Sequence, residues 1–332
     1  MNEPDLKLVE CLQLAPRAPW TLVADVLGMS PVTVARRWEE LESAGIVWVR
    51  GFIRSSPEEP VVRAWVEIDT GGLAAPQLEH SLAGHPDVIG LRRTSGVRDY
   101  LALVVAHGLD ALADFAGGVA GLDQCRSIRM HLVTHALAIG STWSLNVLDA
   151  AQRRRLPSTR FDRASTPIRP HAIDRGLFAA LERDGRASFQ TLAEELDTSA
   201  ATVKRRIQAL ERAGRLEFRC GAARTDIGYP VSAIYFGSVP ANQVERVSVS
   251  LNSIPGLRMA SVTAGPFNLV LDVWLQSLEE VHRLETRITG RLAEFGVTIS
   301  DRAVVLHTVK HMGRLLDSSG RAIAHLPVSP EP

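Results

Sequence analysis

Three consecutive cations, Lys204, Arg205 and Arg206, are the residues of this chain best placed to do chemistry with a ligand. Ser199 precedes them, and a serine hydroxyl at that position can accept a hydrogen bond from a backbone N–H and start a helix. On such a helix at least two of the three cations face away from the apolar side. Cations there can neutralise phosphates and donate hydrogen bonds to base edges in the DNA major groove. The stretch therefore predicts a DNA-reading helix.

The residues around these cations supply the elements that would hold them in place. Val203, Ile207 and Leu210 recur at helical spacing, so they form one face that can pack on a preceding helix. Gly214 suits the left-handed residue that ends a helix. Helices over 173–184, 188–196 and 200–213, followed by β-rich residues, predict a winged helix-turn-helix.

The same pattern occurs a second time, 169 residues earlier in the chain. Residues 27–50 align with 196–219 without a gap, so helices are expected over 5–14, 20–27 and 31–43 and a strand over 46–53. The chain is therefore an internal duplication, and each copy should be one structural unit. The matched positions include Ser30/Ser199, Thr33/Thr202, Val34/Val203, Arg37/Arg206, Gly45/Gly214, Pro86/Pro255 and Gly96/Gly265.

A second kind of module follows each helix-turn-helix. In the first copy, strands are expected over 61–68, 88–94, 100–106 and 128–139, with helices over 73–82 and 109–119. In the second copy, the strands fall at 231–237, 257–264, 269–274 and 297–309, and the helices at 243–252 and 278–295. This β-α-β-β-α-β order is ferredoxin-like. Its antiparallel sheet carries helices on one face, so a second sheet, from the same chain or another chain, must cover the other face.

The predicted fold class is therefore α+β, with a winged helix-turn-helix and a ferredoxin-like βαββαβ domain repeated twice in tandem. Residues 149–171 contain three prolines and six arginines against two aspartates, which indicates an extended linker. The expected boundaries are 1–55 and 172–225 for the helix-turn-helix domains, 60–148 and 229–316 for the ferredoxin-like domains, 149–171 for the linker and 317–332 for a flexible tail.

Composition excludes several classes of function. The formal net charge is zero, so any affinity for DNA must come from local patches. Three scattered cysteines do not make a disulfide framework or a zinc site. The acidic start has no signal-peptide pattern, and no apolar run approaches the roughly 20 residues of a membrane span. We therefore expect a cytoplasmic protein that does not bind membranes.

No pattern in the sequence indicates catalysis. His131 and His135 could share one face of a strand, but they lack the further cysteine or histidine partners that a metal site needs. No serine or cysteine lies in a nucleophile elbow, and the glycines at 117–121 follow a helix rather than a strand. The sequence thus predicts no catalytic residue, no metal and no cofactor.

The two-part, duplicated pattern resembles the Lrp/AsnC, or feast-famine, family of transcription regulators. The resemblance rests on Ser-x-x-T-V-x-R-R followed by L-E-x-A-G at 30–45 and 199–214, and on the proline–glycine pairs at 86/96 and 255/265. It extends over nearly the whole chain, twice. Family members usually carry one copy per chain, so this chain looks like a fused tandem.

The resemblance implies that the helix-turn-helix domains bind double-stranded DNA, usually as part of a dimer. Residues 1–55 hold six Lys and Arg against seven Asp and Glu, whereas residues 172–225 hold ten against eight. We therefore expect the second domain to bind DNA more strongly. Arg37 and Arg206 have an alternative role, as salt-bridge partners of the glutamates at the end of their helix. The candidate DNA-binding residues are Ser30, Thr33, Arg36, Arg37, Ser199, Thr202, Lys204, Arg205 and Arg206.

The resemblance also implies that each ferredoxin-like domain dimerises through its sheet and holds a small effector, often an amino acid, near the turn between its middle strands. Asp99 would supply a carboxylate for an amino group, whereas Asn268 lacks that charge, which makes the second copy the weaker site. A homodimer or larger homo-oligomer is expected. The candidate effector residues are Thr94, Gly96, Arg98, Asp99, Thr263, Gly265 and Asn268.

Two other functions are compatible with this architecture. Sirohaem decarboxylases share the two-part fold, and some are tandem fusions. They usually show a histidine before a Tyr-Asn-Leu-Trp-Phe-like strand, and neither residues 98–102 nor 267–270 contain one. A sensor or assembly module without DNA binding is the other alternative, because the first helix-turn-helix is nearly neutral. The sequence favours a regulator that is not an enzyme.

Overall fold

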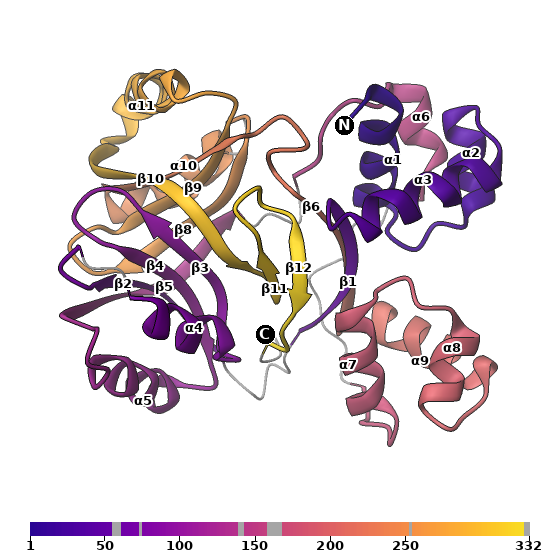
Figure 1. The fold of residues 1–332 in the computed structure, drawn as a ribbon. Helices are drawn as coiled ribbons and strands as arrows, with labels where there is room; N and C mark the ends of the chain where they lie inside the picture. Colours follow the sequence, from indigo (N-terminus) through magenta and orange to yellow (C-terminus); the bar gives the residue numbers. More distant parts are fainter. Residues whose placement is uncertain (55–60, 73–74, 139–142, 158–167, 252–253, 329–332) are drawn as a thin grey trace. The chain divides into compact units, whose positions relative to one another are not determined.

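The computed structural model describes residues 1–54, 61–72, 75–138, 143–157, 168–251 and 254–328, which form two compact units. The first unit contains both helix-turn-helix segments and spans 1–61, 144–223 and 321–332. The second contains both ferredoxin-like segments and spans 62–143 and 224–320 (Figure 1). Each unit is thus built from both copies, copy one before the linker and copy two after it.

The helix-turn-helix segments have the predicted helices and one strand each. Copy one has α1 (Glu3–Leu14), α2 (Trp20–Leu27), α3 (Pro31–Ser43) and β1 (Val47–Ile53). Copy two has α7 (Asp174–Arg183), α8 (Phe189–Glu195), α9 (Ala200–Arg212) and β6 (Leu216–Ala222). Both α3 and α9 end before a glycine in the left-handed region, where φ is +67° at Gly45 and +66° at Gly214. A side chain at these two positions would strain the backbone.

The two strands do not form wings of separate hairpins, because β1 and β6 pair with each other in an antiparallel two-stranded sheet. Arg50 lies opposite Arg219, its own counterpart in the repeat, and Val49 and Gly51 lie opposite Cys220 and Phe218. A register centred on equivalent residues is that of a twofold axis. The first unit is therefore a pseudo-dimer of helix-turn-helix segments within one chain.

Two arginines that the sequence did not single out fasten this pseudo-dimer. Arg17 of copy one donates hydrogen bonds to the carbonyl oxygens of Gly185 and Ala187 in copy two, at 2.5 Å and 3.0 Å. Its guanidinium also lies 5.1 Å from the centre of the Phe189 ring. The turn between α7 and α8 is thus held by a cation from the other copy.

Arg186, the counterpart of Arg17, makes the reciprocal contacts. It donates to the carbonyl oxygens of Pro16 and Ala18 at 2.5 Å and 3.0 Å and lies 3.8 Å from the centre of the Trp20 ring. Burial, and then repulsion by Arg17, lower the pKa of Arg186 to about 10, and burial also lowers the pKa of Arg17. Two desolvated cations thus bind main-chain carbonyls across a pseudo-symmetric contact.

The first part of the predicted linker is not extended. Ala150–Arg155 form helix α6, because the Asp149 carboxylate accepts hydrogen bonds from the backbone N–H groups of Ala151 and Gln152 at 2.7 Å and 2.8 Å. The helix docks on copy one through Arg153, which pairs with the buried Glu10. Residues 158–167 of the predicted linker lie outside the described residues.

The predicted flexible tail also contains ordered contacts. Ala322–His325 form strand β12, and the Ala322 N–H donates to the Gly45 carbonyl at 2.8 Å. The Val328 N–H donates to a carboxylate oxygen of Glu182 at 3.0 Å. These contacts give 322–328 fixed partners within the first unit, and residues 329–332 lie outside the described part of the chain.

The second unit confirms the ferredoxin-like prediction for both copies. Each sheet has the strand order of that fold, β3-β4-β2-β5 in copy one and β8-β9-β7-β10 in copy two. The elements of copy one are β2 (Val62–Asp69), α4 (Pro76–Gly84), β3 (Val88–Thr94), β4 (Tyr100–Ala106), α5 (Leu109–Ala120) and β5 (Ser127–Ala138). Those of copy two are β7 (Val231–Ser238), η2 (Ala241–Gln243), α10 (Val244–Leu251), β8 (Leu257–Ala264), β9 (Leu269–Leu275), α11 (Glu279–Leu292), η3 (Ala293–Phe295), β10 (Thr298–His311) and β11 (Arg314–Leu316).

The two sheets join at both of their edges and close into a ring of eight strands. The fourth strand of copy one, β5, pairs with β8, and the fourth strand of copy two, β10, pairs with β7 of its own copy and with β3. The two junctions share one register, with Val133 opposite Thr263 and Val305 opposite Thr94. The partner sheet that the sequence required is therefore the other copy in the same chain.

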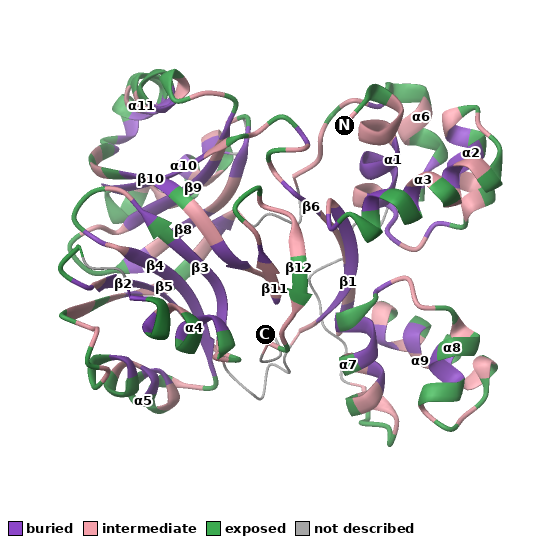
Figure 2. Ribbon diagram, in the orientation of Figure 1, coloured by how far each residue is buried: buried purple, intermediate pink, exposed green. Residues whose placement is uncertain are grey.

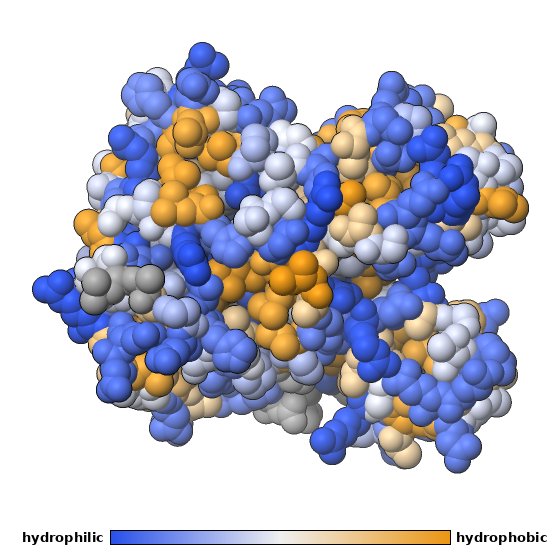
Figure 3. Space-filling view, viewed as in Figure 1, coloured by the Kyte–Doolittle hydropathy of each residue, from blue (hydrophilic) through white to orange (hydrophobic). Residues whose placement is uncertain are grey.

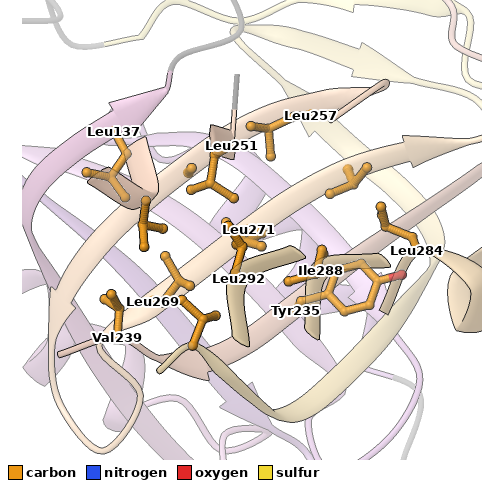
Figure 4. Packing of buried hydrophobic residues seen from close by; sticks show 14 of the residues in the cluster. Leu137, Tyr235, Val239, Leu251, Leu257, Leu269, Leu271, Leu284, Ile288 and Leu292 are labelled. Atoms are coloured by element: carbon orange, nitrogen blue, oxygen red, sulfur yellow. The ribbon is translucent and has the colours of Figure 1, made fainter. Parts of the chain in front are cut away.

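Each sheet packs its outer face on its own helices. In copy two, Leu269, Leu271 and Tyr235 pack under Leu284 and Ile288 of α11 (Figure 4). The buried Tyr235 hydroxyl donates to the Val281 carbonyl at 2.8 Å. The strands are mostly buried while the helices expose their outer sides, and the outward side of α11 is mostly hydrophilic (Figures 2 and 3). The inner faces of the two sheets are thus left to fill the barrel.

Replacing Arg186 with Ala should lower the free energy of unfolding of the first unit by about 2–4 kcal/mol, because two charged hydrogen bonds and an aromatic contact are lost. Arg17→Ala should have a similar effect. Urea unfolding followed by tryptophan fluorescence measures it, since Trp20 and Trp38 lie in this unit. Arg154→Ala, on the exposed side of α6, is the control. A loss no larger than that of the control would contradict the assigned role.

Candidate functional site

The helix α9 presents the predicted cations as the sequence suggested. Val203, Ile207 and Leu210 are buried beneath it, and Lys204 and Arg205 are exposed. The nearest polar contact of the Arg205 guanidinium is the Thr202 hydroxyl, at 3.5 Å. Among the described residues neither exposed cation forms an ion pair, so both are available to a phosphate or a base edge.

Arg206, the third cation, is used inside the protein. It forms a two-pronged ion pair with Asp174 at the start of α7, with N–O distances of 2.7 Å and 2.6 Å. Arg37 of copy one pairs with the equivalent Asp5 at 2.8 Å. Both arginines therefore form salt bridges inside the protein, which is the alternative role that the sequence offered. Their partners are aspartates of the first helix, and not the glutamates at the end of their own helix. Their predicted contact with DNA is not supported.

The predicted hydroxyl groups build the starts of the two reading helices. The Ser30 and Ser199 hydroxyls accept the N–H groups of Thr33 and Thr202, both at 3.1 Å. Each serine hydroxyl also lies 2.8 Å or 2.9 Å from the hydroxyl of its threonine. These residues cap the helix N-termini. Ser30 and Ser199 are also exposed, and their contact with DNA stays a prediction.

The first reading helix, α3, offers less positive charge than α9. Arg36 is exposed, but its guanidinium lies 2.5 Å from a carboxylate oxygen of Glu40, one helical turn away. Ala35 occupies the position of Lys204. Trp38 is buried and donates a hydrogen bond from its ring nitrogen to Glu42 at 3.0 Å.

In the predicted effector turn of copy one, Asp99 binds its own chain. One carboxylate oxygen accepts the N–H and the hydroxyl of Thr70, both at 2.7 Å, and the N–H of Gly72 at 3.2 Å. Burial raises the pKa of Asp99, but these hydrogen bonds, those from Thr70 first, outweigh it and lower the pKa. The carboxylate thus closes the loop after β2 and is not held ready for an amino group.

Asn268 performs the same task in copy two. Its side-chain oxygen accepts the N–H of Val239 and its nitrogen donates to the carbonyl of Val239, both at 2.8 Å. Val239 is the counterpart of Thr70, so an amide replaces a carboxylate where the partner offers a carbonyl instead of a hydroxyl. The change from Asp99 to Asn268 is therefore a change of loop closure.

The remaining predicted turn residues also have identifiable tasks. The Thr94 hydroxyl donates to the Arg98 carbonyl at 2.9 Å, and the Thr263 hydroxyl donates to the Phe267 carbonyl at 2.6 Å. The turn at Gly96 has φ of +96°. A Cβ on Gly265 would lie 2.9 Å from Nδ1 of His131, so a side chain there would collide with the barrel interior.

Arg98 is the one predicted effector residue whose side chain enters a buried charged cluster. Its Nε lies 3.3 Å from Glu67, and its Nη2 pairs with Asp301 of β10. Glu67 also lies 3.1 Å from Nε2 of His131. The Arg98 guanidinium stacks 4.3 Å from the centre of the Phe236 ring, so copy two covers the cluster of copy one.

A second charged pair lies across the barrel. Arg92 of β3 contacts Asp272 of β9 at 2.6 Å, and the Trp65 ring nitrogen donates to the Ser261 hydroxyl at 3.0 Å. The sequence singles out neither of these contacts, nor the roles of Glu67 and Asp301. Polar residues at alternate positions of otherwise apolar strands were the available signal. Alternation of polar and apolar residues along a strand looks the same whether the polar face packs on another sheet or faces water.

The described residues give no support for two other kinds of site. No group of three or more His, Cys, Asp or Glu side chains among them could hold a metal ion. His131 is buried against Glu67, whereas His135 is exposed, so the two histidines do not converge. None of the described helices combines the length and the apolar character that crossing a membrane requires.

Comparison with known proteins agrees with this geometry. The pattern of the AsnC-type helix-turn-helix domain matches residues 1–42 and again 172–211, and that of the Lrp/AsnC ligand binding domain matches residues 63–142. The HTH-type transcriptional regulator LysM of Saccharolobus solfataricus is 30% identical over 144 residues, which are 43% of this chain and 96% of LysM. The chain belongs to the Lrp/AsnC family of transcriptional regulators. LysM of Sulfurisphaera tokodaii is 25% identical, over 43% of this Lrp/AsnC chain and 97% of its own.

The resemblance to solved structures can extend along most of the duplicated chain. The siroheme decarboxylase NirDL aligns with 94% of this Lrp/AsnC chain and 93% of its own, with a TM-score of 0.62 and 15% identity. At this identity the likeness shows a shared fold. The tandem arrangement of the family's two domains is therefore found in another protein as well.

The buried Glu67 should make the second unit sensitive to acid. Burial raises the pKa of Glu67, but the hydrogen bond from His131 and the charge of Arg98 outweigh it and hold the pKa below the ordinary 4.5. A depressed pKa contributes stability above the unfolded value, and that stability is lost as the pH falls through the folded value. Glu67→Gln should therefore cost about 3 kcal/mol at pH 7, and the difference from the unmodified protein should shrink below pH 4.5.

Urea unfolding at pH 7, 5, 4 and 3 tests this, followed by tryptophan fluorescence, to which Trp65 in the barrel contributes. The exposed Glu294→Gln is the control, since it should leave the curve unchanged at every pH. A Glu67→Gln deficit that stays constant across this range would refute the assigned ionic role.

Proposed function

We propose that this chain is a sequence-specific DNA-binding regulator that responds to a small-molecule effector, an amino acid or a related metabolite. The observation that carries the DNA half is the β1–β6 pair, which sets two helix-turn-helix segments about a twofold register inside one chain. A dimer of such segments is the usual reader of paired half-sites. Lys204 and Arg205 of α9 supply the exposed cations for the groove.

The residues divide the work of recognition by their chemistry. The Arg205 guanidinium can donate two hydrogen bonds to a guanine edge, and the Lys204 ammonium is a point charge suited to a phosphate. Ser199 and Thr202 shape the helix N-terminus, where backbone N–H groups can meet another phosphate. Arg37 and Arg206 keep the reading helices fixed on α1 and α7, so their contribution to binding is indirect.

The effector half rests on the ligand-binding pattern at 63–142 and on the charges inside the barrel. Arg98 is the candidate contact, because an effector carboxylate would compete with Glu67 and Asp301 for its guanidinium. Gly96 and Gly265 have no side chain, so an effector could approach the backbone of either turn closely. Such a ligand acts by binding one arrangement of the protein more tightly than another. Thr94, Asp99, Thr263 and Asn268 shape the turns and are not proposed as ligands.

Decarboxylation of a sirohaem-like tetrapyrrole is the alternative activity. NirDL, a siroheme decarboxylase, supports it through the fold alone. The histidine expected for that chemistry is absent from residues 98–102 and 267–270, and His131 is engaged by Glu67. The homo-oligomer and the cytoplasmic location expected from the sequence stay predictions.

Selection of bound duplexes from a random DNA pool, at two salt concentrations, tests the DNA half. We expect a recurrent sequence whose affinity falls steeply with salt, because phosphate contacts release counterions. The protein with Lys204→Ala and Arg205→Ala is the control and should recover no enriched sequence. If the unmodified protein recovers only background sequences, the proposed DNA function is wrong. Absorbance titration with iron uroporphyrin would then test the decarboxylase alternative.

Thermal unfolding in the presence of each of the twenty amino acids tests the effector half. A true effector should raise the melting temperature, because it binds the folded state alone. The same ligand should lose this effect on Arg98→Ala when the comparison is made relative to the ligand-free variant. If no amino acid raises the melting temperature of the unmodified protein, the proposal of an amino-acid effector is wrong. The proposal of DNA binding is tested separately by the selection experiment.

A further inference from the structure

The two reading helices share one scaffold. Arg37 and Arg206 make the same ion pair to the first helix, and Ser30 and Ser199 make the same cap. The buried faces of α3 and α9 also correspond, with Val34, Trp38 and Leu41 against Val203, Ile207 and Leu210. Any difference between the readers therefore lies in the side chains that face solvent.

Those outward side chains differ at nearly every position. The pairs of equivalent residues, α9 first, are Ala201/Val32, Lys204/Ala35, Arg205/Arg36, Gln208/Glu39, Ala209/Glu40 and Arg212/Ser43. The α9 set carries three cations and no acid, and the pair Glu211/Glu42 beside it adds one acid to each copy. The α3 set carries one cation and two acids, so the formal charges are +3 and −1.

The contacts enlarge this difference. Arg36, the one cation of the α3 set, is held 2.5 Å from Glu40, and Glu39 is exposed beside it. Arg205 has the Thr202 hydroxyl as its neighbour, at 3.5 Å. A helix laid in the major groove brings its outer side chains close to both phosphate strands. Glu39 and Glu40 would therefore be repelled, whereas Lys204 and Arg205 would be attracted.

The arginine-rich helix α6 does not restore the missing charge to copy one. It packs beside α2, where Arg155 pairs with Asp25, and its Arg153 pairs with Glu10 of α1. Arg154 is the exposed arginine left on this helix. One exposed cation outside α3 does not replace two on the reading face.

We infer that each chain reads DNA through α9 alone and that α3 is a folded reader that has lost its affinity for DNA. This inference rests on the proposed function and makes it more specific. The operator bound by one chain is then asymmetric, with one half-site in contact and the position of the second left unread. The pseudo-dimer holds α9 in place while copy one contributes structure.

The experiment compares matched variants of the full chain on the duplex recovered by selection. Lys204→Ala with Arg205→Ala should weaken binding by about 100-fold or more and lower the salt slope by about 2. Arg36→Ala, the counterpart in copy one, should change affinity less than about 3-fold. All three side chains lie on exposed helix surface, and circular dichroism checks that each variant keeps its helices.

A gain-of-function variant provides the independent arm. Val32→Ala, Ala35→Lys, Glu39→Gln, Glu40→Ala and Ser43→Arg together give α3 the outward side chains of α9. Selection with this variant should recover a second half-site about one helical turn of DNA from the first. Failure of the graft to extend the site would count against the inference, because the scaffold of α3 would then not be that of a reader.

The outcomes separate the inference from the proposed function. Comparable losses for Arg36→Ala and for the α9 double variant would show that both helices read DNA, which overturns the inference and leaves the regulator standing. Absence of any enriched duplex overturns both. Loss with the α9 variant alone, together with extension of the site by the graft, supports a one-sided reader.

Discussion

The structure depends on one requirement, that every open edge and bare face of one copy be covered by the other. A four-stranded ferredoxin-like sheet has an apolar face under its helices and an opposite face with no cover of its own. It also has two edge strands with unpaired N–H and C=O groups. Pairing β5 with β8 and β10 with β3 satisfies both edges at once, because a closed ring has no free edge. The β1–β6 pair solves the same problem for the helix-turn-helix segments.

Duplication within one chain lets the two halves of a symmetric contact diverge. Where the contact still needs identical residues, they are kept, as in Arg17 and Arg186 with their reciprocal carbonyl partners. Where it does not, the copies differ. Glu67 and Arg98 of copy one correspond to Phe236 and Phe267 of copy two, so a charged set meets an aromatic set inside the barrel. A second copy of the charged set would take another ion pair out of water, which is costly.

The same divergence explains the two reading helices. Their fastening to the first helix uses one arginine–aspartate pair in each copy, and those pairs are retained. Glu39 of α3 and Lys204 and Arg205 of α9 are exposed, so these side chains contribute little to folding. The residues at the outward positions can therefore differ between the copies. The outward surfaces of α3 and α9 carry different charges although the two helices share one fold. Family membership describes the scaffold, and the outward side chains decide what each scaffold binds.

The elements, the duplication and the fold class could all be predicted from the residues alone. Helix and strand periods, the serine caps and the helix-ending glycines are local signals, and an offset that persists along the chain is visible without coordinates. Lys204 and Arg205 were recognisable for the same reason, since helical spacing alone turns them away from the apolar face. Tertiary structure decided the rest. It turned Arg206 and Asp99 inward to partners far along the chain, joined the strands of one copy to those of the other, and gathered Glu67, Arg98, His131 and Asp301 inside the barrel. These outcomes depend on which long-range partner satisfies a polar group, and residue spacing carries no record of that choice.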